Sequence, residues 1–473
     1  MATETILMAI ALVFGLYMAW SIGANDVANA MATSVGSGAL TLKRAVIVAA
    51  VLEFSGAVLV GTHVSETVRQ GIISPEVFKS TPMLLVYGMI AALLAAGIWL
   101  QLASYFGLPV STTHSIVGSI IGFGIVIAGI ESVHWHKVAE IVSSWVISPL
   151  LSGTIAYLIF RLIRKRIFLS QHPVKATKKL TPYLVFFVFM ILTLVMVFKG
   201  LKNLRLDLSF SAALLVAGIV GSIAAVLSSW LVAKVKVEAL PERMRKFQSP
   251  KVIKNIEKSI RNLGKAEKFA EGDVEGMIIT VKNDLQVISK SLGKGEEIDQ
   301  SIDDYHGVEK IFIYLQILSA AFVAFAHGAN DVANAVGPLA AVITVLKSGI
   351  VSMKSQVPLW ILALGGVGIV FGLATWGWRV IETIGKKITE LTPTRGFSAE
   401  FATATTIVFA SKLGLPISTT HTLVGAVLGV GLARGISALN LRTVRDIILS
   451  WLITIPVGAV LAIIFYFILK SIF

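Results

Sequence analysis

The sequence predicts an all-α polytopic membrane protein with two inverted-topology repeats, broken helices or re-entrant hairpins, and about 10–12 transmembrane segments. The first observation is compositional: 55% of the 473 residues are hydrophobic, 14% are charged, and the mean hydropathy is +0.82. This balance excludes a soluble globular domain. The second observation is repetition, because three short motifs each occur twice and in the same order. Two related halves facing one another are the organisation of many secondary transporters.

The repeated motifs carry the polar residues of otherwise apolar sequence. GANDVANA occupies 23–30 and 328–335. The second motif reads GLPVSTTH at 107–114 and GLPISTTH at 414–421, and the third reads SWVISPLLSG at 144–153 and SWLITIPVGA at 450–459. Polar residues in membrane segments are unfavourable unless they serve a site, so these motifs are candidates for a substrate or ion pathway.

Apolar runs long enough to cross a bilayer recur along the chain, for example at 5–22, 183–198, 210–233, 310–326 and 447–468. The first run lacks a preceding basic segment and a cleavage site, so we expect a membrane helix of the mature protein and not a signal peptide. We expect a first membrane repeat at 1–166, two linking transmembrane helices within 167–233, a cytoplasmic helical loop at 234–309, and a second membrane repeat at 310–473.

Basic loops indicate the orientation in the membrane. Loop 161–181 carries seven Lys and Arg residues and no acid, and 234–268 is again strongly basic. The two intervening spans return the chain to the same side of the membrane, so the positive-inside rule places both loops in the cytoplasm. We therefore expect a multi-pass protein of the cell (cytoplasmic) membrane. The net charge of +14 also fits nucleic-acid binding. We exclude that partner, because the basic residues cluster beside apolar spans and no nucleic-acid fold pattern occurs.

The segment 234–309 mixes charges with regularly spaced apolar residues, among them Val252, Ile256, Ile260 and Leu263. This spacing is typical of amphipathic helices outside the membrane. We expect a solvated cytoplasmic linker, and a regulatory or oligomer-contact role is the alternative.

The second motif predicts a helix start inside the membrane. Gly107 and Pro109, like Gly414 and Pro416, interrupt the preceding segment, and the hydroxyl residues cap the helix that follows. Hydroxyls, backbone N–H groups and the positive end of the helix dipole favour an oxyanion such as phosphate. The candidate phosphate ligands here are Ser111, Thr112, Thr113, Ser418, Thr419 and Thr420. The alternative, that these hydroxyls only cap or join helices, is disfavoured by their duplication.

GANDVANA offers a carboxylate, two amides and small residues in each copy. A bare carboxylate repels phosphate, so we expect both aspartates to bind a hard cation together with amide and backbone oxygens of a broken helix. The expected ion is sodium, with Asp26, Asn29, Asp331 and Asn334 as ligands, while Asn25 and Asn330 are assigned to phosphate. A protonatable aspartate that couples transport to protons is the alternative. Pairing with a base is disfavoured, because no Lys or Arg lies within two helical turns of either aspartate in sequence.

Two further acids, Glu53 and Glu400, lie in apolar sequence at unmatched positions of the two halves. Each is a candidate for an additional sodium site or a gating contact, and an interhelical hydrogen bond is the alternative. His114 and His421 end the STTH strings. We expect them either to form hydrogen bonds with the residues that bind the substrate or to donate to buried carbonyl groups.

Several classes of function are excluded. The absence of cysteine excludes disulfides, thiolate metal sites and thiol catalysis. No GxxxxGK[ST], GxSxG or HExxH string occurs, so we expect neither an ATP-driven pump with a P-loop nor an enzyme. We expect no cofactor, with sodium ions as co-transported ligands.

The duplicated pairs, Gly23–Ala30 with Ser111–His114 and Gly328–Ala335 with Ser418–His421, resemble the signature of the inorganic phosphate transporter (PiT) family. The resemblance spans 1–165 and 309–473. It implies symport of inorganic phosphate with sodium or protons, an inverted-repeat fold and a homodimer. It also implies that Glu53 and Glu400 match acidic positions required for transport in sodium-coupled relatives, which favours sodium.

The predicted function is therefore secondary symport that imports inorganic phosphate with sodium. Other relatives in the resembled family use protons, carry metal–phosphate complexes or transport sulfate, and these are the alternatives. A passive anion channel is less favoured, because an anion pore gains nothing from buried carboxylates.

Overall fold

The computed structural model describes residues 2–61, 72–197, 208–235, 250–270, 273–292, 295–351, 357–412 and 417–473. Gly414 and Pro416 of the second STTH motif lie outside these ranges. In the described residues the regular structure is helical, apart from one antiparallel bridge between Ile73 and Val133. Eight helices of this part are long and apolar enough to cross a membrane. The predicted all-α polytopic membrane fold is confirmed.

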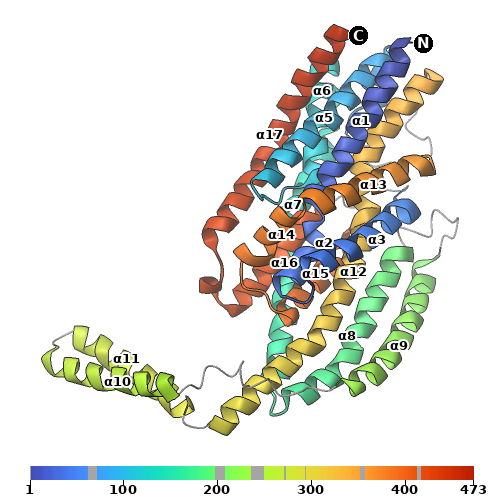
Figure 1. The fold of residues 1–473 in the computed structure, drawn as a ribbon. Helices are drawn as coiled ribbons and strands as arrows, with labels where there is room; N and C mark the ends of the chain where they lie inside the picture. Colours follow the sequence, from blue (N-terminus) through green and yellow to red (C-terminus); the bar gives the residue numbers. More distant parts are fainter. Residues whose placement is uncertain are drawn as a thin grey trace.

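The helices fall into three groups along the chain. The first half contains α1 (Ala2–Asn25), α2 (Ala28–Gly36), α3 (Leu42–Val60), α5 (Pro82–Tyr105), α6 (Thr112–Ala128) and α7 (Trp135–Ile163). The middle contains α8 (Pro173–Val195), α9 (Phe210–Lys234), α10 (Pro250–Ala266) and α11 (Asp273–Leu292). The second half contains α12 (Gly295–Ser348), α13 (Leu359–Trp376), α14 (Trp378–Glu382), α15 (Pro393–Lys412), α16 (Thr419–Arg434) and α17 (Leu441–Ile472). Figure 1 shows α10 and α11 projecting from the bundle near the start of α12.

Each helix of one half packs on a helix of the other half, and the matched helices make the same contacts with the halves interchanged. Helix α1 packs on α13 while α12 packs on α3, and α6 packs on α17 while α16 packs on α7. In Figure 1, α1 starts at one end of the bundle and α12 starts at the opposite end, so these matched helices run in opposite directions. The arrangement is consistent with the predicted inverted repeats.

The glycine of each GANDVANA motif lies at one of these helix crossings. A Cβ atom on Gly23 would clash with the backbone carbonyl of Ile369, and one on Gly328 would clash with the carbonyl of Glu53. Missing side chains allow backbones to approach closely, as small residues do in transmembrane helix packing. The motif glycine thus fixes the crossing that places the rest of the motif.

A broken helix is present at the first GANDVANA motif only. Around Asp26 a turn separates α1 from α2, whereas the second copy lies inside the uninterrupted α12. The expectation of a broken helix at both copies is therefore wrong for the second. His327 and Asp331 approach to 2.8 Å along α12, and a pair at this four-residue spacing stabilises a helix. Ile22 takes the place of His327 in the first copy, which lacks this support.

Two helix starts carry the STTH residues into the protein interior. The link between α5 and α6 turns at Gly107, whose φ of +66° suits glycine. Ser111 Oγ then accepts the His114 backbone N–H at 3.3 Å, and Ser418 Oγ accepts the His421 N–H at 3.2 Å. Both serines are N-caps, which directs the following threonines toward the site.

Candidate functional site

Both GANDVANA motifs and both STTH motifs meet in one buried cluster. Asp26 accepts hydrogen bonds from Thr112 Oγ1 and Thr420 Oγ1, each at 2.7 Å. Asp331 accepts one from Thr419 Oγ1 at 3.2 Å. These five side chains belong to residues that are at most 6% exposed. Asp26 is therefore held by hydroxyls from both halves of the chain.

The motif asparagines connect the two halves further. Asn29 Nδ2 donates to Thr420 Oγ1 at 3.0 Å, and Asn334 Nδ2 donates to the hydroxyls of Thr112 and Thr113 at 3.1 and 3.3 Å. Asn29 Oδ1 is buried without a hydrogen-bond partner. A buried carbonyl oxygen normally has a partner, and hard cations prefer oxygen ligands. The cluster thus offers an unused oxygen beside its carboxylates.

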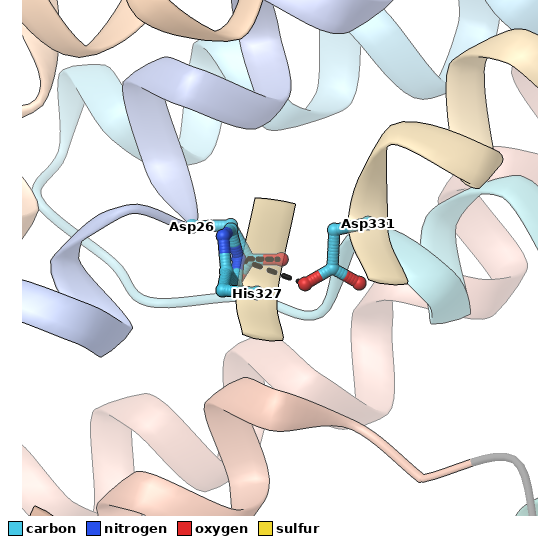
Figure 2. A group of neighbouring side chains, drawn as sticks. All are labelled: Asp26, His327 and Asp331. Carbon is cyan, nitrogen blue, oxygen red and sulfur yellow. Dashed lines mark ion pairs between the residues drawn. The ribbon is translucent and has the colours of Figure 1, made fainter. Parts of the chain in front are cut away.

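A histidine lies at the centre of the cluster. His327 Nε2 is 2.8 Å from Asp331 Oδ2 and 3.6 Å from Asp26 Oδ2, without the alignment of a hydrogen bond to either (Figure 2). Its Nδ1 lies 2.9 and 2.8 Å from the two carboxylate oxygens of Glu53. All four residues are at most 1% exposed. One imidazole therefore lies among three buried carboxylates and offsets at most one of their negative charges.

This charge imbalance favours a bound cation. Asp26, His327 and Asp331 each provide one ligand atom, and these atoms lie within 4.8 Å of one another. At that separation two like unit charges repel by about 3.5 kcal/mol at an effective dielectric constant of about 20. Buried carboxylates without a compensating charge are strongly unfavourable. A cation among these oxygens would relieve the repulsion.

The sequence disfavours pairing of the aspartates with a base, whereas the structure places the imidazole Nε2 of His327 2.8 Å from Asp331 Oδ2. The base is an imidazole and not a Lys or Arg: His327 directly precedes the second GANDVANA motif, four residues before Asp331. Residues at this spacing lie on one face of a helix. The two copies of the motif differ at the position just before the glycine, which is Ile22 in the first half and His327 in the second. A polar residue that only one copy carries is the sequence signal that indicates this histidine.

Glu400 forms a second buried polar centre. It accepts hydrogen bonds from Ser34 Oγ at 3.0 Å and Gln316 Nε2 at 3.5 Å, and from the hydroxyls of Thr33 and Ser319. Thr33 and Ser34 belong to α2, and the other two donors belong to α12. Glu400 itself lies on α15, so its hydrogen bonds join three helices. All four donors are neutral, and none of them compensates the charge of the carboxylate. Interhelical hydrogen bonding, one expected alternative, is present at this site.

Two of the expected phosphate ligands, Asn25 and Asn330, make hydrogen bonds within the protein in this structure. Asn25 Nδ2 donates to the carbonyl of Leu108 at 3.0 Å, and its Oδ1 accepts the N–H of Val110 at 3.1 Å. These bonds fix the link between α5 and α6, so Asn25 positions that link. Asn330 Nδ2 lies 3.2 Å from Asp331 Oδ1 and donates to it, which places this amide beside the carboxylate.

His114 and His421 pack outside the carboxylate cluster. Their ring centroids are 4.4 Å apart. His114 lies against Trp145 with a centroid distance of 3.5 Å, and His421 stacks on Trp451 at 3.7 Å. His421 Nδ1 is also 3.3 Å from the carbonyl oxygen of Trp145. The two histidines therefore hold the starts of α6 and α16 against α7 and α17.

Comparison with known proteins places the chain in a family. Residues 22–462 match the family model described as the phosphate transporter family. The chain belongs to this phosphate transporter family. It is 47% identical to the inorganic phosphate transporter 2-1, chloroplastic, of Arabidopsis thaliana over 100% of this chain and 74% of that relative. It is 44% identical to a putative phosphate permease of Chlamydia trachomatis over 99% of each chain.

A solved structure supports the same assignment. The structure titled "The sodium-dependent phosphate transporter" superposes with a TM-score of 0.77 at 38% identity, covering 99% of this chain and 100% of that one. The resemblance predicted from the duplicated motifs is thus confirmed. This phosphate transporter family member is a multi-pass membrane protein. Membership of a transporter family is consistent with the prediction that the chain is not an enzyme.

Proposed function

We propose that this protein is a secondary active symporter that imports inorganic phosphate together with sodium ions across the cell membrane, and that it works as a homodimer. The observation that carries the proposal is the meeting of Asp26 and Asp331 with hydroxyls from both STTH motifs. The sodium-dependent transporter of similar structure supports the choice of ion.

In this proposal the oxyanion binds between the first turns of α6 and α16. The hydroxyls of Thr112, Thr113, Thr419 and Thr420 and the backbone N–H groups of these turns donate to phosphate. The same hydroxyls now contact aspartates or asparagines. Phosphate binding therefore requires that cations replace hydroxyls as partners of the carboxylates.

Electrostatics gives this exchange an order. Sodium binds first, at Asp26, Asp331 and the unpartnered Asn29 Oδ1, with Asn334 nearby and with Glu53 behind His327. A carboxylate neutralised about 5 Å from the anion removes about 3 kcal/mol of repulsion per unit charge on phosphate at an effective dielectric constant of about 20, a factor of more than about a hundred in affinity. By linkage, phosphate strengthens sodium binding equally. Glu400, with its neutral donors, is the position for a further sodium ion.

Uptake of radiolabelled phosphate by proteoliposomes tests the proposal. An inward sodium gradient should drive accumulation at constant pH, and unlabelled phosphate should compete better than sulfate. Uptake that ignores sodium but follows an inward proton gradient would contradict sodium coupling. It would support the second candidate, proton-coupled symport, which the imidazole of His327 among three carboxylates favours. Equilibration without any gradient dependence would instead indicate a passive channel.

A further inference from the structure

An open groove runs between α8, α9 and the first membrane turns of α12. Its volume is about 640 Å³. Apolar side chains form nearly all of its wall, including Phe189, Ile223, Leu227 and Leu315. Ile223 and Leu227 are each 57% exposed, and Tyr314 in the same wall is 62% exposed. An exposed apolar groove of this size on a membrane-spanning surface is suited to a hydrocarbon chain.

One end of the groove is positively charged. Lys178 Nζ, at the start of α8, donates to the carbonyl of Val235 at 2.8 Å, and Val235 itself lines the groove. Lys234 Nζ lies 3.2 Å from the ring centroid of Trp230 at the end of α9. The described residues that line the groove include no Asp or Glu. The positive-inside rule assigns this end to the cytoplasmic leaflet, where anionic lipid headgroups attract lysine.

We propose that this groove binds an anionic phospholipid, with an acyl chain between α8, α9 and α12 and its phosphate group at Lys178 and Lys234. A second copy of the chain is the competing occupant. In a two-fold dimer about the membrane normal, both copies would bring these lysines together at the same depth, and like charges repel. A lipid phosphate instead supplies the complementary charge.

Helix α12 connects the groove with the polar interior. Leu315 and Leu318 line it, and the neighbouring Gln316 and Ser319 on α12 contact Glu400. Helices α8 and α9 belong to the part of the chain that the repeated motifs do not cover, so a lipid here supports α12 and not its counterpart α1. The bound lipid thus contacts the second membrane repeat, through α12, and not the first.

Native mass spectrometry of the full chain tests the lipid directly. Wild-type protein and K178Q/K234Q are incubated in detergent with phosphatidylglycerol and phosphatidylcholine of identical acyl chains. Each lysine near a membrane surface strengthens anionic lipid binding about fivefold, so the double variant should retain about 25-fold less phosphatidylglycerol and unchanged phosphatidylcholine. The control K386Q/K387Q removes two exposed lysines at another site and should retain phosphatidylglycerol like wild type.

A second variant separates the groove from its charged end. Ile223→Trp fills an exposed part of the wall without touching the lysines, and should lower retention of both lipids. Equal phosphatidylglycerol retention in wild type, K178Q/K234Q and I223W would overturn the proposal. A dimer that dissociates in I223W while lipid retention stays unchanged would assign the groove to a second copy and also overturn it. These measurements read lipid binding, so they are independent of the transport proposal.

Discussion

Replacing Asp26 by asparagine tests the electrostatic core of the transport proposal. Asparagine has nearly the same shape. Asp26 accepts the hydroxyls of Thr112 and Thr420 on separate oxygens, each at 2.7 Å; the Oδ1 of asparagine can accept one of them, and its Nδ2 can donate to the other hydroxyl. The charge is the main loss. For a cation within the 4.8 Å that spans the cluster, that loss is about 3.5 kcal/mol or more at an effective dielectric constant of about 20. Sodium affinity should therefore fall several hundredfold.

The assay is sodium-driven uptake of radiolabelled phosphate in proteoliposomes, combined with calorimetric titration of sodium into purified protein. D26N should show background uptake and a sodium dissociation constant raised by more than 100-fold. Asp446→Asn is the matched control, since this side chain on α17 is 46% exposed and pairs with Arg445. It should transport like wild type.

Two results would refute the reasoning. Undiminished sodium-stimulated uptake by D26N would remove the cation role of this carboxylate. Lost uptake with an unchanged sodium dissociation constant would show that Asp26 acts at another step, such as the motion that opens a transporter's site to one side of the membrane and then to the other. Gel filtration of D26N distinguishes lost uptake from misfolding.

Three further outcomes follow from the same geometry. Thr112→Val with Thr419→Val removes two hydroxyl donors, each worth about 1 kcal/mol or more toward an anion, and should weaken phosphate binding at least tenfold in titrations at saturating sodium; unchanged affinity would exclude the hydroxyls as ligands. Glu400→Gln should reduce the sodium stimulation of uptake, while the phosphate affinity at saturating sodium should change little, because the contacts of Glu400 do not include the threonines of the STTH motifs. A sodium dependence identical to wild type would contradict a cation site at Glu400. Gly372→Ala should destabilise the protein by about 2–3 kcal/mol in detergent unfolding, because its Cβ would clash with the Trp20 carbonyl, whereas Gly218→Ala, with open space around it, should be neutral.

Much of this architecture could be predicted because duplication leaves a direct record in the sequence. Two copies of a carboxylate–amide motif and two copies of a hydroxyl motif, each in apolar sequence, predict that the four strings share one interior site. The contacts of Asp26 with Thr112 and Thr420 fit that prediction, since one hydroxyl comes from each half.

The partners of individual side chains could not be predicted in the same way. They depend on how far each helix crosses its neighbour, and backbone contacts such as Gly328 on Glu53 set that crossing. Asn25 was expected at phosphate, yet the crossing directs its amide to the backbone of Leu108 and Val110. Spacing along one helix gives no information on such contacts between distant segments.

Alignment of the two halves also shows that Glu400 has no acidic counterpart in the first half. Counting 21 residues back from the histidine that ends each STTH string reaches Glu400 in the second half and Leu93 in the first. The polar centre of Glu400 thus has an apolar counterpart. Sequence alone indicates this asymmetry but not the four neutral donors, which come from α2 and α12.

The same asymmetry explains how a duplicated scaffold can carry an unequal distribution of charge. Gly23 meets Ile369 where Gly328 meets Glu53, so the pair of Ile22 and Ile369 in one crossing corresponds to the pair of His327 and Glu53 in the other. A glutamate at the apolar crossing without a histidine beside it would bury another uncompensated carboxylate, and each added like charge at about 5 Å is unfavourable by about 3 kcal/mol. The apolar residues Ile22 and Ile369 thus confine the His327–Glu53 pair to one crossing. The cation site is therefore expected to respond unequally to motions of the two halves.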